Sequence, residues 1–230
     1  MDLIVSANDA KLVRSAGRDS FPEQAAPDTL TLIDAAQFPP RVLAIAEVAT
    51  SIAGPPQAVA LAPNGRVAIV SASNHYDSAA GKQVFDPLLQ VVDLSKRPPR
   101  VVRRVDVGHH PQGVAINRDG TLLLAATTGG TVAVLTLHET AVELIDRLEL
   151  ADGRLAGVSF THDGRHALVA LRDAQGVAVL AVEGTRVRDT GERVSTGVAP
   201  YAIDVSGDGR WAVVGNVGLA GLSAPAARLC

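Results

Sequence analysis

The 230-residue sequence is poor in cysteine, aromatic residues and lysine, and it contains no long apolar run. Cys230 is the only cysteine, which excludes an intramolecular disulfide framework and a cysteine-based zinc site. No apolar run approaches the ~20 residues that a membrane-spanning helix needs, so we expect no membrane span. The first residues lack the basic start and the apolar stretch of a signal peptide, which as written favours the cytoplasm.

What the chain does contain is enough apolar material for a large core. Hydrophobic residues make up 47% and charged residues 20%, which is typical of a globular protein rather than a disordered one. The formal net charge is −3, and because nucleic-acid binders usually carry a basic excess, we do not expect a nucleic-acid partner. No stretch of useful length shows a helical period.

One hairpin sequence motif recurs four times along the chain. Alternating apolar residues lead into Asn-Gly or Asp-Gly, and a second apolar run follows. Such dipeptides favour the turn of a β-hairpin, so we name the two strands of each copy A and B. The copies cover residues 56–70, 111–125, 155–169 and 200–214. Their turn glycines are Gly65, Gly120, Gly164 and Gly209, at spacings of 55, 44 and 45 residues.

Two further kinds of apolar strand, C and D, recur between the hairpins. Strand C is predicted at 29–34, 89–93, 131–135 and 177–180, and strand D at 42–48, 101–107, 144–150 and 187–194. Four short strands in a repeat of about 45 residues are typical of a propeller blade. The predicted fold is therefore all-β, a β-propeller of four-stranded antiparallel blades. A β-sandwich with irregular strands is the alternative, but it does not predict a recurring hairpin motif.

The hairpin motif reads Pro-x-x-Val-Ala followed by Asp-Gly-Arg, and the third strand carries Thr-Val-x-Val-Leu or Ile-Asp. This pattern resembles the YVTN-repeat β-propellers. That family groups with the lactonase-like and WD40-like propellers. The resemblance extends over residues 1–217 and implies about seven blades. Residues 73–77 and 214–218 are also similar to an exported bacterial subgroup, which implies a periplasmic or exported location for a full-length parent.

By this reading the chain carries about four of some seven blades and is a partial propeller or fragment; a closed four-bladed ring is the alternative. The open sheet edges of a partial ring favour self-association. The predicted boundaries are an incomplete B-C-D blade at 1–53, complete blades at 54–107, 108–151 and 152–196, an A-B hairpin at 197–217, and a non-repeat tail at 218–230.

In this arrangement the D-to-A and B-to-C connections share one face, which also receives the long insertions at 9–28 and 74–87. Loops gathered on one face of a rigid scaffold are where binding usually resides. We therefore expect ligand-binding residues on this loop-rich face, although ordinary solvated loops are the simpler reading. The candidates are Asn74, His75, Tyr76, Asp77, His109, His110, Arg172 and Asn216.

The histidines among these candidates do not predict a metal site or a cofactor. Adjacent residues in an extended chain point to opposite sides, so one metal ion would rarely take both His109 and His110. His75 and Asp77 could complete such a site only if the fold brought them close. The glycine pattern that begins at Gly207 matches a dinucleotide fingerprint, but it lies in a hairpin turn instead of before a helix. No nucleophile elbow is present.

Two functions follow from this sequence. The first is a non-catalytic binding or scaffolding module that uses the loop-rich face for a protein or a small molecule. The second is a lactonase-type hydrolase, which the family resemblance implies for some relatives. Hydrolysis of a lactone would need a general base or a metal at the channel mouth, with His75, Asp77, His109 or His110 as candidates. Since fold alone does not give function, we favour the binding module and no enzymatic activity.

Overall fold

The computed structural model describes residues 2–16, 18–22, 26–51, 55–71, 74–77 and 79–218. These residues form 21 strands and contain no helix, which confirms the all-β prediction. Within these ranges, accordingly, no helix offers the length and apolar character that crossing a membrane requires.

Seventeen of the strands build five antiparallel sheets that follow one another along the chain. The first sheet holds β1 (Leu3–Asn8), β4 (Thr29–Asp34) and β5 (Arg41–Glu47), in that order. The second holds β6 (Val59–Leu61), β7 (Val67–Val70), β10 (Leu88–Asp93) and β11 (Arg100–Asp106). The third holds β12 (Pro111–Ile116), β13 (Leu122–Thr127), β14 (Thr131–His138) and β15 (Ala141–Glu149). The fourth holds β16 (Leu155–Phe160), β17 (His166–Leu171), β18 (Gly176–Glu183) and β19 (Arg186–Ser195), and the fifth is the hairpin of β20 (Pro200–Val205) and β21 (Ala212–Asn216).

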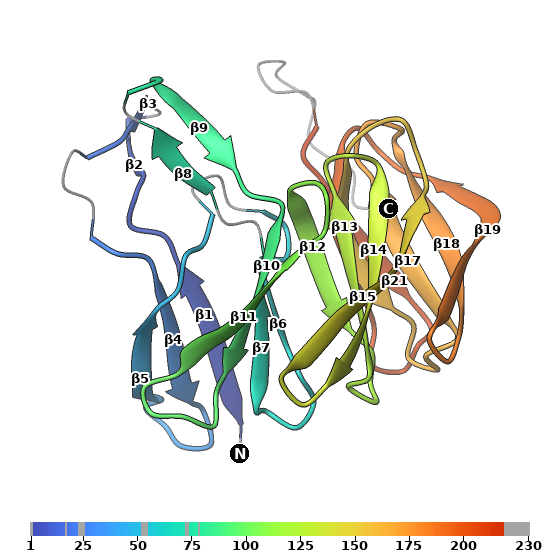
Figure 1. Ribbon diagram of the computed structural model, residues 1–230. Coiled ribbons are helices and arrows are strands. Elements are labelled where there is room, and N and C mark those ends of the chain that lie inside the picture. The colour runs from blue at the N-terminus through green and yellow to red at the C-terminus, as the bar shows by residue number, and fades with distance from the viewer. Residues whose placement is uncertain are drawn as a thin grey trace.

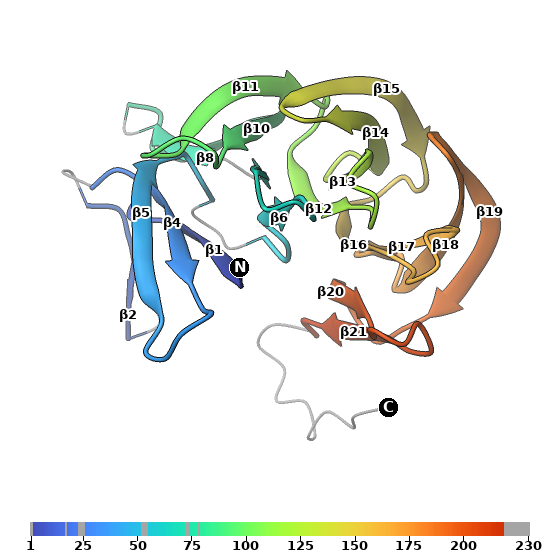
Figure 2. The same ribbon diagram turned by 90° about the horizontal axis from the view of Figure 1, so that it is seen from below.

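The sheets stand side by side around a common centre in a propeller-like arc. Figure 2 shows β6, β12, β16 and β20 near the centre, with β5, β11, β15 and β19 at the periphery. The first sheet and the β20–β21 hairpin lie at the two ends of this arc. In the second, third and fourth sheets the strands therefore follow one another in chain order, A to D, from the centre outward.

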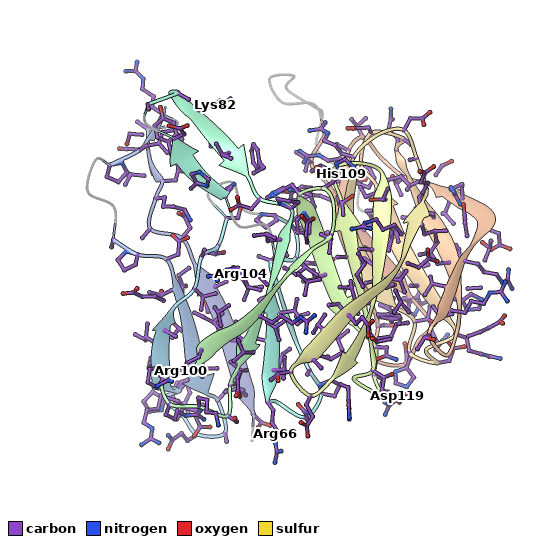
Figure 3. All side chains as sticks on the ribbon, viewed as in Figure 1. Arg66, Lys82, Arg100, Arg104, His109 and Asp119 are labelled. Carbon is purple, nitrogen blue, oxygen red and sulfur yellow. The ribbon has the colours of Figure 1, made fainter. Side chains whose placement is uncertain are left out.

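The two faces of the arc differ as the strand order predicts. The turns between strands A and B and between C and D lie at the lower end in Figure 1, and the labelled Arg66, Arg100 and Asp119 mark that end in Figure 3. Lys82 and His109 lie at the opposite, loop-rich end.

The core lies between neighbouring sheets, so the middle strands are apolar on both of their faces. In β13, Leu122 and Leu124 pack toward the fourth sheet, while Leu123 and Ala125 pack toward the second. All six residues of β13 are consequently buried. A third apolar cluster joins the first and second sheets through Leu30 and Leu32.

The A-to-B turns lie where the hairpin motif predicts them, with one difference in their geometry. Gly65, Gly120, Gly164 and Gly209 all have a positive φ, between 67° and 70°, as a hairpin built on Asn-Gly or Asp-Gly predicts. The preceding Asn or Asp does not share it. In three of the four turns its side chain instead accepts a hydrogen bond from the backbone two residues later, as Asp163 does from Arg165. In the third sheet the Asn117 side chain accepts the corresponding bond, from the Thr121 backbone. The turns are therefore longer than the two-residue type.

The sequence suggested that the two insertions are open loops. In the structure each of them contains a short hairpin on the loop-rich face. Residues 9–28 contain β2 (Val13–Ser15) and β3 (Arg18–Ser20). Residues 74–87 contain β8 (Asn74–Asp77) and β9 (Lys82–Phe85). They project together at the top of Figure 1, where the rings of Phe21 and Tyr76 stack with centroids 4.1 Å apart.

Candidate functional site

A cavity of about 420 Å³ lies on the loop-rich face near the centre of the arc. Its walls come from the D-to-A and B-to-C connections of the second, third and fourth sheets, from the β9 end and from the start of β20. The lining residues are Ser51, Pro55, Phe85, His110, Gln112, Thr128, Arg154, Arg172 and Tyr201. The volume falls within the range of small-molecule sites in proteins.

His110 is the buried histidine of this cavity, with 7% of its surface exposed. Its Nδ1 lies 3.2 Å from the Asp86 carbonyl oxygen, and because a carbonyl can only accept, Nδ1 donates. The Phe85 ring packs against the imidazole edge-on at 4.8 Å between centroids. Burial lowers the pKa of His110, with the Asp86 carbonyl and carboxylate opposing the shift. The imidazole is therefore neutral near pH 7, with its proton on Nδ1.

Arg172 lies on the face of the Tyr201 ring, 4.8 Å from guanidinium carbon to ring centroid. Its backbone N–H donates to the Arg154 carbonyl at 3.0 Å, which fixes the B-to-C connection of the fourth sheet beside the start of β16. The contact joins the fourth sheet to the terminal hairpin. Stacking uses the face of the guanidinium and leaves the N–H groups at its edge available to a ligand.

Arg154 and Asp173 form a bidentate ion pair at the edge of the cavity. Arg154 Nη2 donates to Asp173 Oδ1 at 2.7 Å, and Nε donates to Oδ2 at 2.9 Å. The hydrogen bonds from the Arg154 side chain are the largest cause that holds the pKa of Asp173 at about 2, and they raise the pKa of Arg154. This arginine is thus neutralised by its partner.

The inner strands approach closely beneath the cavity, and Gln57 ties them together. Its Oε1 accepts from the Val158 backbone at 2.7 Å, and its Nε2 donates to the Ile203 carbonyl at 3.2 Å. A Cβ at Gly113 would lie 2.4 Å from the Ala156 carbonyl oxygen, and one at Gly157 would lie 2.7 Å from that of Tyr201. Both contacts are too short for any side chain, so glycine sets the distance between these strands.

Two of the eight residues that the sequence selected, His110 and Arg172, line this cavity. His109, which directly precedes His110 in the sequence, lines a separate groove of about 650 Å³ with Glu149 and Asp152. The two adjacent histidines thus line different spaces. Asn216 is exposed at the end of β21.

The Asn74–Asp77 segment has a structural part in the β8–β9 hairpin. Tyr76 stacks on the other insertion, and the Asp77 carboxylate accepts hydrogen bonds from the backbone of Ala79 and Ala80 in the hairpin turn. His75 Nδ1 lies 3.9 Å from Asp86 Oδ1 and lines a third cavity beside the first sheet. Over the described ranges, no three His, Cys, Asp or Glu side chains are grouped to hold a metal ion.

Sequence reasoning missed Tyr201, Phe85 and Arg154. A signal for Tyr201 was present in the repeat itself: the second residue of the hairpin motif is glutamine at Gln57 and Gln112, alanine at Ala156 and tyrosine at Tyr201. In a chain with few aromatic residues, an aromatic side chain at this place on an inner strand, at the loop-rich end, points to a site. Phe85 and Arg154 carry no comparable signal, because their positions depend on how the sheets are angled.

Comparison with protein-family models finds no match for this chain, and comparison with curated proteins finds none either. Solved structures are similar to it. A functionally unknown protein from Desulfotomaculum acetoxidans matches with a TM-score of 0.66 and 22% identity, over 82% of this chain and 56% of that one. A provisionally named 6-phosphogluconolactonase from Bacteroides uniformis matches with a TM-score of 0.67 and 14% identity, over 93% and 61%. Kuenenia stuttgartiensis hydrazine synthase matches with a TM-score of 0.55 and 20% identity, over 76% and 46%.

At these identities the likeness concerns the fold alone. It supports an all-β, propeller-like architecture shared with a lactonase-like neighbour. The chain spans roughly half to three fifths of the length of the structures that it matches.

Proposed function

We propose that this chain is a non-catalytic binding module that holds a small molecule in the 420 Å³ cavity of its loop-rich face. One observation carries the proposal: connections around the second, third and fourth sheets converge there with β9 and β20, and they bring together a buried neutral His110 and an Arg172–Tyr201 stack. Such a combination of apolar walls with a few convergent polar groups is typical of ligand sites.

The architecture belongs to the same proposal. The sheets are taken as blades of a YVTN-type propeller of about seven, with boundaries at 1–53, 54–107, 108–151, 152–196 and 197–217. Three observations support this assignment: the recurring hairpin motif, the five consecutive sheets, and the share of each similar structure's length that the chain spans.

The proposal is tested by a small-molecule screen read out by thermal shift and by NMR. Thr128 lines the cavity, so Thr128→Trp fills it, whereas Asp119→Trp places the same bulk on the opposite face. Bound compounds should lose their effect in Thr128→Trp and keep it in Asp119→Trp. A library without binders, or binders that ignore Thr128→Trp, would refute a ligand site here.

A lactone hydrolase is the second candidate, favoured by the neutral imidazole of His110 in the cavity. Of the histidines and carboxylates that the sequence offered as bases, His110 is the one that lines this cavity. It could take a proton from water as the water attacks the lactone carbonyl, and the ring would open to a hydroxy acid. Release of acid from δ-valerolactone in a pH-stat, lost in His110→Gln, would favour this activity over binding alone.

A further inference from the structure

We infer that the molecule held in this cavity is a small organic oxyanion, a carboxylate or a phosphate monoester, with Arg172 as its charged anchor. This inference rests on the proposed binding function and specifies the ligand. It depends on the charges of the lining residues, on how Arg172 is held, and on the apolar walls beside it.

The charges that line the cavity are of one sign. The nine lining residues include two arginines and no carboxylate. Asp173 neutralises Arg154 through the bidentate pair, so that arginine adds little net charge. The Asp86 carboxylate lies 3.9 Å from His75 and lines the neighbouring cavity beside the first sheet, and it also acts electrostatically on His110. Among the lining residues, all in the described part of the chain, Arg172 is the cation that no ion pair offsets.

Arg172 is held in place without being neutralised. In the portion of the chain that the structure describes, no carboxylate forms an ion pair with its guanidinium; the adjacent Asp173 acts on it electrostatically, but its hydrogen bonds go to Arg154. The Tyr201 ring fixes the guanidinium by its face, and the backbone bond to Arg154 fixes its connection. A pre-positioned arginine with free edge N–H groups suits two oxygens of a carboxylate or phosphate.

The remaining walls favour an organic ligand over an inorganic ion. Phe85 and Pro55 supply apolar surface, and the Thr128 and Ser51 side chains and the Gln112 amide supply polar groups. A volume of about 420 Å³ exceeds what a bare phosphate fills. A ligand with a ring or short apolar body and one anionic end matches this division.

The test uses three probes that share one ring: benzoate, phenyl phosphate and benzyl alcohol. Their dissociation constants are measured by calorimetry at low salt for the wild-type chain and for Arg172→Met, Arg172→Lys and Arg188→Met. Arg188 is an exposed arginine paired with Glu183 on the outer part of the fourth sheet, so its variant removes the same charge away from the cavity. Thermal melts of each variant establish that it is folded.

We expect one or both anions to bind, and benzyl alcohol to bind more weakly than they do. Arg172→Met should weaken anion binding about 10- to 100-fold, as expected for a lost charged hydrogen bond. Arg172→Lys should fall between, and Arg188→Met should match the wild type. The stronger of the two anions identifies the headgroup.

Equal binding of the alcohol, or unchanged anion binding in Arg172→Met, would overturn the oxyanion inference while leaving a cavity that binds ligands. Compounds in the screen that are neutral or cationic and sensitive to Thr128→Trp would do the same. Absence of any binder in both experiments would overturn the binding function itself.

Discussion

Strands β13 and β21 occupy the same place in their repeats but have opposite surroundings. Leu124 and Val213 are each the fourth residue after the turn glycine. Leu124 is 0% exposed, because the second and fourth sheets cover the two faces of β13. Val213 is 70% exposed, because the far face of the hairpin and the outer edge of β21 meet no other sheet or strand among the described residues.

This comparison separates what a strand's sequence specifies from what its neighbours supply. The alternating pattern and the Asp-Gly turn are sufficient to form the β20–β21 hairpin, with the same positive φ at Gly209 as at Gly120. Burial of that hairpin needs a sheet on each side, and one side is provided by β16 and β17. The cavity spans this boundary, because Arg172 belongs to the well-covered fourth sheet and Tyr201 to the hairpin.

The largest difference is expected from truncating the two equivalent side chains. Leu124→Ala should lower the free energy of unfolding by about 2–5 kcal/mol, through lost burial and the cavity left behind. Val213→Ala should change it by less than about 0.5 kcal/mol. Urea unfolding measures both. Since leucine is larger than valine, Val169→Ala, at a 0% exposed site in β17, supplies the matched chemical change. Similar costs for the two valines would contradict the comparison.

Glycines on the inner strands and on β21 give the next contrast. A methyl group at Gly113 would meet the Ala156 carbonyl, so Gly113→Ala should cost on the order of 1–3 kcal/mol through a forced shift of β12 from β16. A methyl group at Gly215 meets nothing within 4 Å, and Gly215→Ala should be neutral or slightly stabilising. Thermal melts distinguish the two. An equally stable Gly113→Ala would show that the inner strands do not pack this closely.

The buried His110 predicts a smaller, pH-dependent effect at the well-covered side of the cavity. Its folded pKa lies below the unfolded value of about 6.5, so the unfolded chain takes up the proton first as pH falls. The stability that neutral His110 contributes is therefore fully present above about pH 6.5 and is lost as pH falls toward the folded pKa. The advantage of the wild type over His110→Gln should shrink across that window. A constant difference from pH 5 to 8 would be inconsistent with a buried neutral histidine.

The smallest effect on stability is expected at the exposed edge, where association is the readout. Unpaired strand edges and apolar sheet faces promote pairing between chains, and edge lysines oppose it. Val213→Lys should leave the free energy of unfolding nearly unchanged but lower the apparent mass in light scattering at high protein concentration. A wild-type chain that stays monomeric at every concentration would remove β21 as an association site.

Much of the fold follows from the sequence because its signals are local. The two-residue alternation of apolar side chains, the turn glycines and the recurring motif predict all seventeen strands of the five sheets. The predicted strand C at 29–34, for example, matches β4. The β8–β9 hairpin was not predicted, because Lys82–Phe85 lacks a regular apolar alternation. Its contacts, such as Tyr76 on Phe21, join insertions from different repeats.

The site was predictable only in part, for the same reason. His110 and Arg172 could be placed on the loop-rich face from strand order alone. Their partners depend on tertiary approach: the Tyr201 ring meets Arg172 from the next sheet, and Asp86 meets His110 from an insertion. Strand order gives the end of the sheet at which a residue lies, but not the neighbour that it contacts.

The most direct test of the account is backbone hydrogen exchange with and without phenyl phosphate, resolved by residue. The central claim is that a ligand in the cavity joins the terminal hairpin to the well-covered sheets through Arg172 and Tyr201. Binding should slow exchange in β20 and in the Arg172 connection, leave the already protected β13 unchanged, and lose its effect in Arg172→Met. Slowed exchange confined to the A-to-B turns of the opposite face, or unchanged exchange in β20 despite binding, would contradict the claim.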